Sequence, residues 1–281
     1  MTEVVANSRM LGLRDVRLHV DDRGAGRPVV LLHGWPLSSA TWWPQLPCLF
    51  DASLRSIAYD RRGFGNSDKP KTGYGYDTLA DDLAGVLEAL DLWDVTLVGF
   101  SMGGGEVARY IARHGEERLR SVVFASSVTP RMMHLPDNPD GPLSAMKAGA
   151  MTLRLTADPD GFFDQFTRDY YSPNADGDVL VTEADRRRAI ALCKQADRLA
   201  ALEAMQSFGI ADFRDDLAKI TVPTLVIHGD ADGIVPFEGS GARTHAAIPH
   251  SELVVLEGAP HGCNLTHAGA FNAALLRFLK T

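Results

Sequence analysis

The most restrictive feature of this sequence is a repeated alternation of short apolar runs with segments of helical periodicity. The runs are rich in β-branched residues and apolar almost throughout, as expected for parallel strands that are buried on both faces. The predicted strands span residues 16–20, 28–32, 54–59, 95–100, 121–125, 222–227 and 252–256. Amphipathic helical segments lie between or after them, at 78–90, 103–114, 239–248 and 268–279. This alternation predicts a fold of the α/β class, with a mostly parallel central sheet and helices on both faces.

The alternation stops between residues 128 and 213, where the sequence predicts helices and no strand. A loop rich in Pro, Asp and Gly lies at 136–142, and helical patterns follow near 143–156, 159–170 and 182–207. A helical insertion between two parallel strands is expected to lie over the carboxyl edge of the sheet, where open α/β sheets bind ligands. We therefore divide the chain into a first core part (1–127), a helical lid insertion (128–213) and a second core part (214–281).

The charge and the cysteine content narrow the class of protein. Lys and Arg number 28 against 36 Asp and Glu, so the net charge is −8, and the chain has no basic run. Neither nucleic acid nor a membrane surface is therefore expected as a partner. The three cysteines are far apart and in no ligand spacing, which is typical of reduced thiols. Because the sequence shows no signal-peptide pattern and no apolar stretch of membrane-spanning length, we expect a soluble cytoplasmic protein.

Residues 99–103 (GFSMG) match the pattern G-x-S-x-G at the junction of a predicted strand and a predicted helix. At such a junction a serine has a strained backbone conformation, and the flanking glycines let neighbouring chain approach closely. The hydroxyl then lies at a helix N-terminus, where backbone N–H groups favour developing negative charge. Ser101 is therefore the predicted nucleophile. The alternative is an N-cap serine in an ordinary strand–helix turn.

A serine nucleophile on such a turn needs a histidine base, and the order along the chain is expected to be serine, acid, histidine. Of the nine histidines, His261 lies in a loop directly after the last predicted strand, from which it can reach back over the sheet edge. His33 and His228 also end predicted strands, and for them we expect hydrogen-bonded structural roles. His261 is the predicted base.

Two aspartates compete for the role of the acid in the turn after the strand at 222–227. Asp232 lies further from the strand end, and Pro236 restricts the loop behind it. Asp230 is interpreted as an Asx-type turn residue, whose side chain binds nearby backbone amides. These features favour Asp232 and leave Asp230 as the alternative.

The three residues define a mechanism of acyl transfer. His261 takes the proton of Ser101 while the serine attacks a carbonyl carbon, and Asp232 holds the imidazole in the correct tautomer. An acyl-enzyme forms and is then released.

The oxyanion of this reaction needs two preorganised backbone donors. One is the N–H of Met102, the residue after the nucleophile. The other comes from the loop after the strand at 28–32. Trp35 is the predicted donor there, because Gly34 allows the loop to approach closely and Pro36 has no N–H.

These motifs together resemble the α/β-hydrolase family, and within it the bacterial cofactor-free (non-haem) haloperoxidases and their arylesterase and perhydrolase relatives. The resemblance runs from about residue 16 to residue 279. Six segments in the same order carry it: 33–38 (HGWPLS), 59–65 (YDRRGFG), 99–104 (GFSMGG), 212–214 (DFR), 226–236 (VIHGDADGIVP) and 259–262 (APHG). In this family the acid is the second aspartate of the Gly-Asp-x-Asp turn, which implies Asp232. The turn at 60–63 is structural in the family.

The resemblance also implies which residues line the substrate pocket. Alignment on the motifs places the family's pocket positions on Trp35, Val128, Phe166, Tyr170, Ile234 and Phe237. Pro36 counts with them, because family members with a proline there look like the perhydrolases. A second interpretation of the aromatic residues at 162–171 is core packing within the lid. The sequence departs from the family at Met132, where relatives commonly carry an aromatic residue, and at Gly105, a third glycine in the elbow.

The activity that the resemblance implies is hydrolysis of small aryl or short-acyl esters, with peracid formation from hydrogen peroxide as a further activity. No cofactor and no metal are expected, since the histidines and cysteines show no ligand spacing. A lactonase or γ-lactamase with the same triad is the alternative, and a non-catalytic ligand-binding receptor on this fold is a further one. The expected partner is a small-molecule ester. Relatives often self-associate, so a homo-oligomer stands as an alternative to a monomer.

Overall fold

The computed structural model describes residues 6–280, and its central feature is an eight-stranded sheet in the order β1-β2-β4-β3-β5-β6-β7-β8. The strands span Ala6–Gly12 (β1), Arg17–Arg23 (β2), Pro28–Leu32 (β3), Arg55–Tyr59 (β4), Val95–Phe100 (β5), Leu119–Ala125 (β6), Thr224–Gly229 (β7) and Glu252–Leu256 (β8). Neighbours from β4 through β8 are parallel, whereas β1 and β2 form an antiparallel edge. Every residue of β5 and β7 is buried, as strands covered on both faces must be. The predicted α/β fold is confirmed.

The antiparallel edge is where the sequence was least informative. Strand β1 was not predicted, and β2 extends three residues beyond the predicted strand at 16–20. The side chains of residues 7–10 are exposed, so β1 has neither an apolar run nor an apolar–polar alternation. An edge strand of this kind is defined by its pairing with β2 and leaves little trace in the local sequence.

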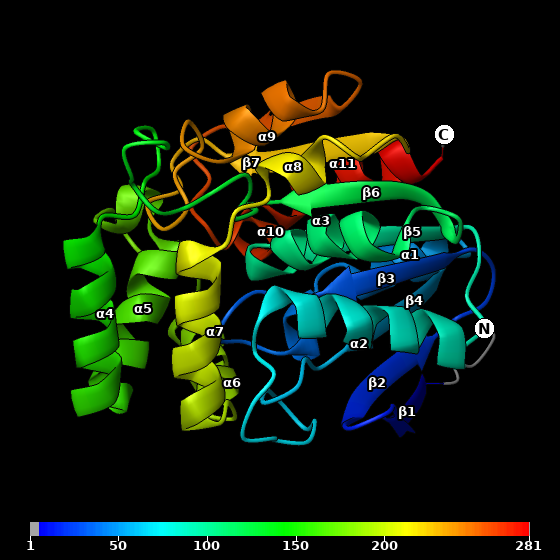
Figure 1. Ribbon diagram of the computed structural model, residues 1–281, viewed down its shortest axis with the longest axis horizontal. Coiled ribbons are helices and arrows are strands. Elements are labelled where there is room, and N and C mark those ends of the chain that lie inside the picture. The colour runs from blue at the N-terminus through cyan, green and yellow to red at the C-terminus, as the bar shows by residue number, and fades with distance from the viewer. Residues whose placement is uncertain (1–5, 281) are drawn as a thin grey trace.

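Helices cover both faces of the sheet (Figure 1). They span Leu46–Asp51 (α1), Tyr76–Ala89 (α2), Met102–His114 (α3), Arg214–Leu217 (α8), Gly241–Ala247 (α9), Cys263–Thr266 (α10) and Ala268–Leu279 (α11). Helices α2 and α3 pack side by side, and α11 contacts β7, β8 and α1 on the other face. A short 3-10 helix, Ser39–Trp42 (η1), precedes α1. The predicted helices at 78–90, 103–114, 239–248 and 268–279 correspond to α2, α3, α9 and α11.

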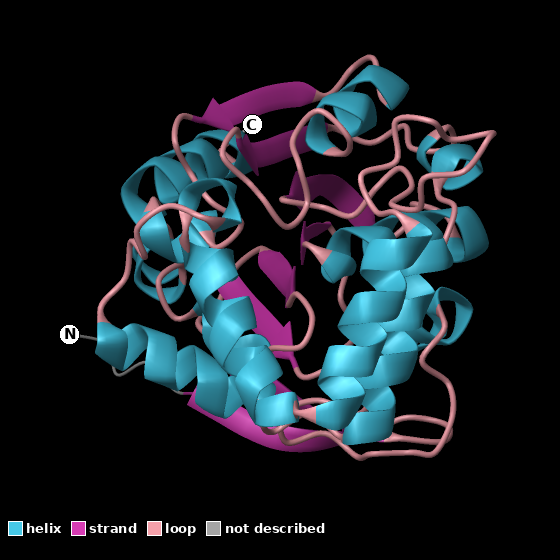
Figure 2. Cartoon of the chain, turned by 90° about the vertical axis from the view of Figure 1, so that its left-hand side faces the viewer, coloured by secondary structure: helices cyan, strands magenta, loops and turns pink. Residues whose placement is uncertain are grey.

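Four further helices lie between β6 and β7, beyond the end of the sheet toward which β6 points (Figure 1, left; Figure 2 views the molecule from their side). They are Ala145–Ala157 (α4), Pro159–Tyr171 (α5), Glu183–Cys193 (α6) and Arg198–Ile210 (α7), with a 3-10 turn, Pro173–Ala175 (η2), after α5. The helical pattern predicted at 182–207 is divided into α6 and α7. The division occurs because the Asp197 carboxylate accepts hydrogen bonds from the N–H groups of Leu199 and Ala200 and so starts a new helix. The bounds 128–213 of a separate lid remain a prediction.

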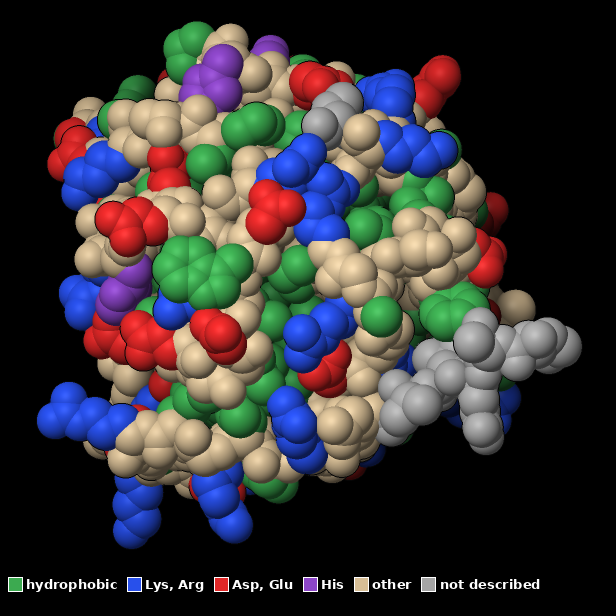
Figure 3. All heavy atoms as spheres, turned by 90° about the vertical axis from the view of Figure 1, so that its right-hand side faces the viewer, with side chains coloured by type: hydrophobic (Ala, Val, Ile, Leu, Met, Phe, Trp, Pro, Cys, Tyr) green, Lys and Arg blue, Asp and Glu red, His purple; other side chains and the backbone are tan. Residues whose placement is uncertain are grey.

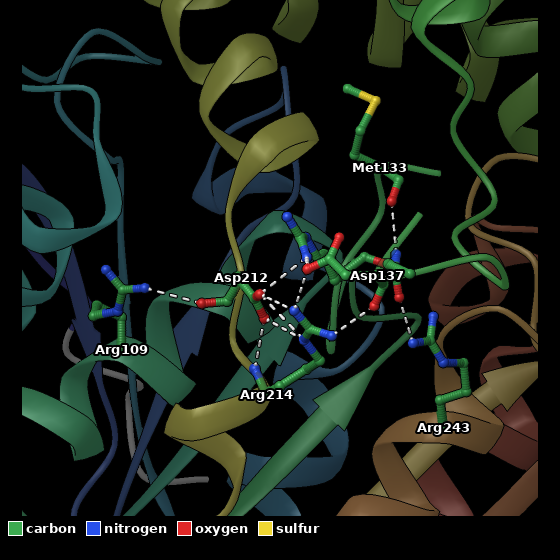
Figure 4. Close-up of polar contacts among 8 residues, drawn as sticks. Arg109, Met133, Asp137, Asp212, Arg214 and Arg243 are labelled. Atoms are coloured by element: carbon green, nitrogen blue, oxygen red, sulfur yellow. Dashed lines mark hydrogen bonds and ion pairs between the residues drawn. The ribbon is translucent and has the colours of Figure 1, made fainter. Parts of the chain in front are cut away.

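An ion-pair network fastens the two chain segments that connect these helices to the sheet (Figure 4). Asp137 lies on the outgoing segment, and Asp212 and Arg214 lie where the chain returns. The Arg214 guanidinium is 3.0 Å from Asp137 and 2.6 Å from Asp212. Arg131 is 2.6 Å from Asp137 and 3.2 Å from Asp212. Each of the two arginines therefore pairs with both aspartates. The network gives the segment 212–214 a physical role in holding the entry and exit of the helices together.

On the face of the molecule opposite these helices, basic and acidic side chains are interspersed, and neither kind forms a large patch (Figure 3). Among residues 6–280, no helix is both long enough and apolar enough to cross a membrane.

Candidate active site

Ser101 lies on the sharp turn between β5 and α3, with φ of 54° and ψ of −117°. This left-handed conformation is rare for a residue with a side chain and indicates local strain. The neighbouring strand holds the turn in place, because the Ser101 N–H donates to the Ala125 carbonyl at 2.8 Å. The hydroxyl group therefore lies at the N-terminus of α3, where the helix dipole favours negative charge.

The glycines around Ser101 are required by close approach of the backbone. A Cβ on Gly99 would lie 2.5 Å from the Gly103 carbonyl oxygen, and one on Gly103 would lie 2.6 Å from the Leu32 carbonyl oxygen. The third glycine, Gly105, also has a packing reason. A Cβ there would lie 2.5 Å from the ring of Phe213, which packs edge-to-face against Tyr76. All three glycines let α3 approach its neighbours more closely than alanine would.

His261 lies in the loop between β8 and α10, and its ring connects the serine to an aspartate. The Nε2 atom is 2.9 Å from the Ser101 Oγ, and the Nδ1 atom is 2.6 Å from the Asp232 Oδ2. The ring is buried between Phe100 and Tyr170, whose centroids lie 5.4 Å and 5.1 Å away. This packing restrains the ring plane, and the two hydrogen bonds form a continuous chain from the Ser101 hydroxyl through the ring to the Asp232 carboxylate.

The structure places Asp232 and Asp230 in different environments. Asp232 is buried, and its Oδ1 accepts hydrogen bonds from the N–H groups of Ile234 and Val235 at 2.9 and 2.7 Å. Asp230 is exposed, and its carboxylate accepts the N–H of Gly258 at 2.7 Å. Asp230 thus binds a backbone amide near its turn, as an Asx-type turn residue does. The hydrogen bond to His261 is made by Asp232.

The electrostatics of Asp232 favour its ionised form. Burial by itself raises the pKa of the carboxyl group, but the facing His261 and hydrogen bonds with His228 and His261 outweigh this effect and hold the pKa well below its ordinary value. His228 Nε2 lies 2.8 Å from the Val235 carbonyl and 3.3 Å from the Asp232 Oδ2. This histidine therefore has the hydrogen-bonded role expected for it, with the addition of a contact to the acid.

The loop that follows β3 lies directly against the serine. An ideal Cβ on Gly34 would lie 3.1 Å from the Ser101 Cβ, so only glycine fits there without displacement. The Trp35 indole donates to the Ala201 carbonyl of α7 at 2.9 Å, which ties this loop to the insertion. Within residues 6–280, neither the Trp35 N–H nor the Met102 N–H has a hydrogen-bond partner. Both predicted oxyanion donors are thus free to bind a ligand atom.

A cavity of about 260 Å³ contains Ser101 and His261 in its wall. Most of the wall is apolar and comes from the loops after β3 and β6, from helices α4, α5 and α7, and from the turn after β7. The largest apolar lining residues are Trp35, Met132, Leu143, Met151, Phe162, Phe166, Phe208 and Ile234. Besides Ser101 and His261, the polar side chains in the wall come from α4 and α5: Lys147, Arg154, Gln165 and Asp169.

The predicted pocket residues fall into two groups. Trp35, Val128, Phe166 and Ile234 lie in the cavity wall. Met132, where the sequence departs from the family, also lies in it. Tyr170, Phe237 and Pro36 are not among the residues that line it. The Tyr170 ring packs on His261, and the Phe237 ring packs on His228 at 5.7 Å. Pro36 is buried.

The remaining lining residues were not predicted as pocket residues. Most of them lie on helices that were predicted. The helical pattern shows which residues share a face of a helix, but not which face is turned to the cavity. Which face of α4, α5 or α7 turns to the cavity depends on how these helices pack on the sheet edge, and the local sequence does not contain that information. Within residues 6–280, no group of three or more His, Cys, Asp or Glu side chains is arranged to hold a metal ion.

Comparison with known proteins assigns this site to a class. A family model described as alpha/beta hydrolase fold matches residues 27–268. The chain therefore belongs to the α/β-hydrolase fold family, as its motifs suggested.

The relatives narrow the class further. The chain is 42% identical to the non-heme chloroperoxidase CPO-A1 of Kitasatospora aureofaciens, over 94% of this chain and 96% of that protein. It is 34% identical to the bifunctional esterase/perhydrolase DCH of Acinetobacter calcoaceticus, over 90% and 92%. Among solved structures, a bromoperoxidase from Bacillus anthracis superposes with a TM-score of 0.94 at 45% identity, over 98% of this chain and all of that one. The resemblance to the non-haem haloperoxidase group is confirmed.

Proposed function

We propose that this protein is a serine hydrolase that cleaves small aryl or short-acyl carboxylic esters through an acyl-enzyme. The observation that carries the proposal is the continuous hydrogen-bonded line from Ser101 through His261 to Asp232, with its serine end in the wall of an apolar cavity. A receptor on the same fold has no need for a strained serine beside a histidine with an ionised aspartate.

In the first half of the reaction the Ser101 Oγ forms a bond to the ester carbonyl carbon, and its proton passes to His261 Nε2. The carbonyl oxygen becomes an oxyanion and accepts hydrogen bonds from the Trp35 and Met102 N–H groups. The C–O bond to the leaving group then breaks, and the departing oxygen takes the proton from His261. In the second half, water attacks the acyl-enzyme by the same route and releases the acid.

Perhydrolysis differs only in the second nucleophile. Hydrogen peroxide attacks the acyl carbon in place of water, its proton passes to His261, and a peracid leaves while Ser101 is regenerated. The esterase/perhydrolase name of a relative at 34% identity and the haloperoxidase names of others support this activity. In this proposal the peracid, formed without metal or haem, is the species that oxidises halide.

The size and character of the cavity support small substrates. About 260 Å³ of mainly apolar space suits an aryl ring or a short acyl chain better than a long polar one. A panel of p-nitrophenyl acetate, p-nitrophenyl butyrate, a γ-lactone, a γ-lactam, and acetate with hydrogen peroxide tests the proposal. Turnover of the esters above all others supports it, whereas faster lactone or lactam turnover moves the assignment to the alternative. Absence of turnover with all of them contradicts the proposal.

Pro36 directly follows Trp35, the proposed oxyanion donor, in the chain. Proline fixes its own φ and restricts the conformation of the residue before it, here Trp35. The Trp35 carbonyl accepts no hydrogen bond from any residue between 6 and 280, so it is available to accept one from attacking hydrogen peroxide. We expect Pro36→Leu to lower the ratio of perhydrolysis to hydrolysis, while ester hydrolysis stays within about tenfold of wild type, a barrier change of ~1.4 kcal/mol.

The measurement compares peracetic acid formation from acetate and peroxide with p-nitrophenyl acetate hydrolysis on one preparation. Pro136→Leu is the matched control, because Pro136 is exposed in the loop before α4. An unchanged ratio in Pro36→Leu would remove the proposed role of Pro36 and leave a plain esterase.

A further inference from the structure

A buried cluster of His33, Arg61 and Glu106 lies behind the loop that carries the Trp35 N–H, and the mechanism above does not use it. We propose that His33 and Arg61 are positioning residues: they fix the orientation of the peptide group between Gly34 and Trp35 and thereby aim the Trp35 N–H at the oxyanion. This inference rests on the proposed function, because it assigns the parts that hold one half of the proposed oxyanion hole.

The hydrogen bonds of His33 define its tautomer. The backbone N–H of Arg61 lies 3.0 Å from His33 Nε2, and a backbone N–H can only donate. The Nε2 atom is therefore the acceptor, so the single proton of the neutral ring is on Nδ1. The Nδ1–H donates to the Gly34 carbonyl oxygen at 2.9 Å. Arg61 Nη1 lies 3.4 Å from Nδ1, but both atoms are donors in this tautomer, so that approach is a contact only.

The neutral ring is also what the surroundings favour. Burial and the nearby Arg61 guanidinium lower the pKa of His33 to about 3. The ring therefore stays neutral, with Nε2 available as an acceptor, throughout the pH range in which an esterase of this kind would be measured.

The bond to the Gly34 carbonyl determines the direction of the next N–H group. The Gly34–Trp35 peptide is trans, since the cis bonds of the described chain are Trp35–Pro36 and Thr129–Pro130. In a planar trans peptide the carbonyl and the N–H point to opposite sides. Fixing the Gly34 carbonyl against His33 Nδ1 therefore points the Trp35 N–H the other way. The Leu37 N–H donates to the same carbonyl at 3.1 Å and adds a second restraint.

Arg61 connects this loop to the helix that carries the nucleophile. Its Nη2 donates to the His33 carbonyl at 2.8 Å, and its Nε donates to the Glu106 carboxylate of α3 at 2.8 Å. Tyr59 donates its hydroxyl to the other Glu106 oxygen. Because Met102 begins α3, one guanidinium holds the elements that supply both proposed oxyanion donors at a fixed separation. Arg61 and Glu106 are both almost completely buried, so little solvent weakens this connection.

A purely structural role for the cluster makes a different prediction, and the choice of substitution at His33 separates the two. In His33→Asn, the side-chain amide nitrogen takes the place of Nδ1 and can still donate to the Gly34 carbonyl. In His33→Gln, the amide lies near the position of Nε2 and cannot reach that carbonyl as a donor. If positioning is the role, His33→Gln loses turnover and His33→Asn recovers much of it.

We expect His33→Gln to lower kcat for p-nitrophenyl acetate by about 10- to 100-fold, with KM changed less than threefold. A displacement of about 1 Å at a positioned group costs that much, and loss of a whole oxyanion donor costs about 10²- to 10³-fold. Binding of a trifluoromethyl ketone, whose adduct with the serine carries an oxyanion, should weaken in parallel with kcat. His33→Asn should lose clearly less of both. His245→Asn is the matched control, because His245 lies on α9 and bonds Ser251 away from the cavity.

Two outcomes would overturn the inference. One is that His33→Gln keeps kcat within threefold and binds the ketone as wild type does. The other is that His33→Asn and His33→Gln lose activity equally, in proportion to a drop in Tm, which indicates a structural role alone.

Two further measurements keep the inference testable if no ester is turned over or if His33→Gln does not fold. Nitrogen-15 NMR of histidine-labelled wild-type protein should show one ring that stays neutral in the Nδ1–H form down to about pH 4, and this signal should be absent in His33→Asn. A pyridine-like Nδ1 on that ring contradicts the inference. A fluorophosphonate reports the proposed function separately, since Ser101 Oγ forms a bond to phosphorus as fluoride leaves and the hydroxyl proton passes to His261. An unlabelled wild type counts against the proposed function, whereas equal labelling rates in wild type and His33→Gln count against the inference.

Discussion

Replacing Ser101 with alanine is expected to abolish ester hydrolysis while the fold survives. Ser101 is the hydroxyl in hydrogen-bond contact with His261, at 2.9 Å, and it lies in the wall of the cavity. Removal of the nucleophile of such a triad lowers kcat by about 10⁴- to 10⁶-fold. The bond from the residue-101 N–H to Ala125 does not involve the side chain, and alanine has no greater difficulty with a φ of 54° than serine. The free energy of unfolding should therefore change by less than about 1 kcal/mol.

The measurement is p-nitrophenyl acetate hydrolysis, with thermal unfolding followed on the same sample. Ser251→Ala provides the control, since Ser251 bonds His245 and Ile248 after α9 and has no contact with the cavity. Retention of a tenth of wild-type turnover in a pure preparation of Ser101→Ala would show that another group is the nucleophile.

Some elements of the fold could be predicted from the sequence, and others could not. The parallel strands were predictable because burial on both faces makes their sequences apolar throughout, as in β5 and β7. Strand β1 was not, because its pairing partner and not its own composition makes it a strand. The division of 182–207 into α6 and α7 depends on one capping residue, Asp197, inside an otherwise helical pattern.

At the site, residues whose positions depend on local backbone structure could be predicted, and residues whose positions depend on the packing of distant helices could not. The elbow is a local backbone structure, so the five-residue motif together with the strand pattern before it and the helix pattern after it placed Ser101 at a strand–helix junction. His261 and Asp232 follow strand ends, and neighbouring parallel strands bring their ends to one sheet edge. The cavity wall depends instead on the packing of α4, α5 and α7. That is why Tyr170 was expected in the wall and lies against the His261 ring.

The buried cluster behind the oxyanion loop shows a further limit. His33 was correctly expected to be hydrogen-bonded, but its partners come from positions 34 and 61, and the pairing with Arg61 exists only because β3 and β4 are adjacent in the sheet. The sequence of the turn at 60–63 does not indicate which backbone carbonyl the Arg61 side chain binds.

The second large effect separates the two aspartates of the turn after β7. In Asp232→Asn, the amide oxygen is expected to take the place of Oδ1, because two backbone N–H groups, from Ile234 and Val235, point at that position. The amide NH₂ then faces His261 Nδ1, so two donors meet unless the ring moves its proton to Nε2. A ring protonated at Nε2 cannot accept the Ser101 proton, and no negative charge remains to stabilise an imidazolium. We expect kcat to fall by about 10⁴-fold, as loss of the correct tautomer does in other triads.

Asp230→Asn provides the matched comparison on the same turn. Its exposed carboxylate accepts one N–H, from Gly258, and an asparagine carbonyl oxygen can accept the same bond. The variant should keep turnover within about threefold, a barrier change of less than ~1 kcal/mol, and lose about 1 kcal/mol of stability at most. Both variants remove one negative charge from neighbouring positions, so a general change in net charge cannot produce the difference between them. Turnover measured with one ester and one protein concentration decides the assignment. A large loss in Asp230→Asn with near wild-type turnover in Asp232→Asn would mean that Asp230 orients the histidine. The turn would then have to rearrange so that the exposed carboxylate points inward.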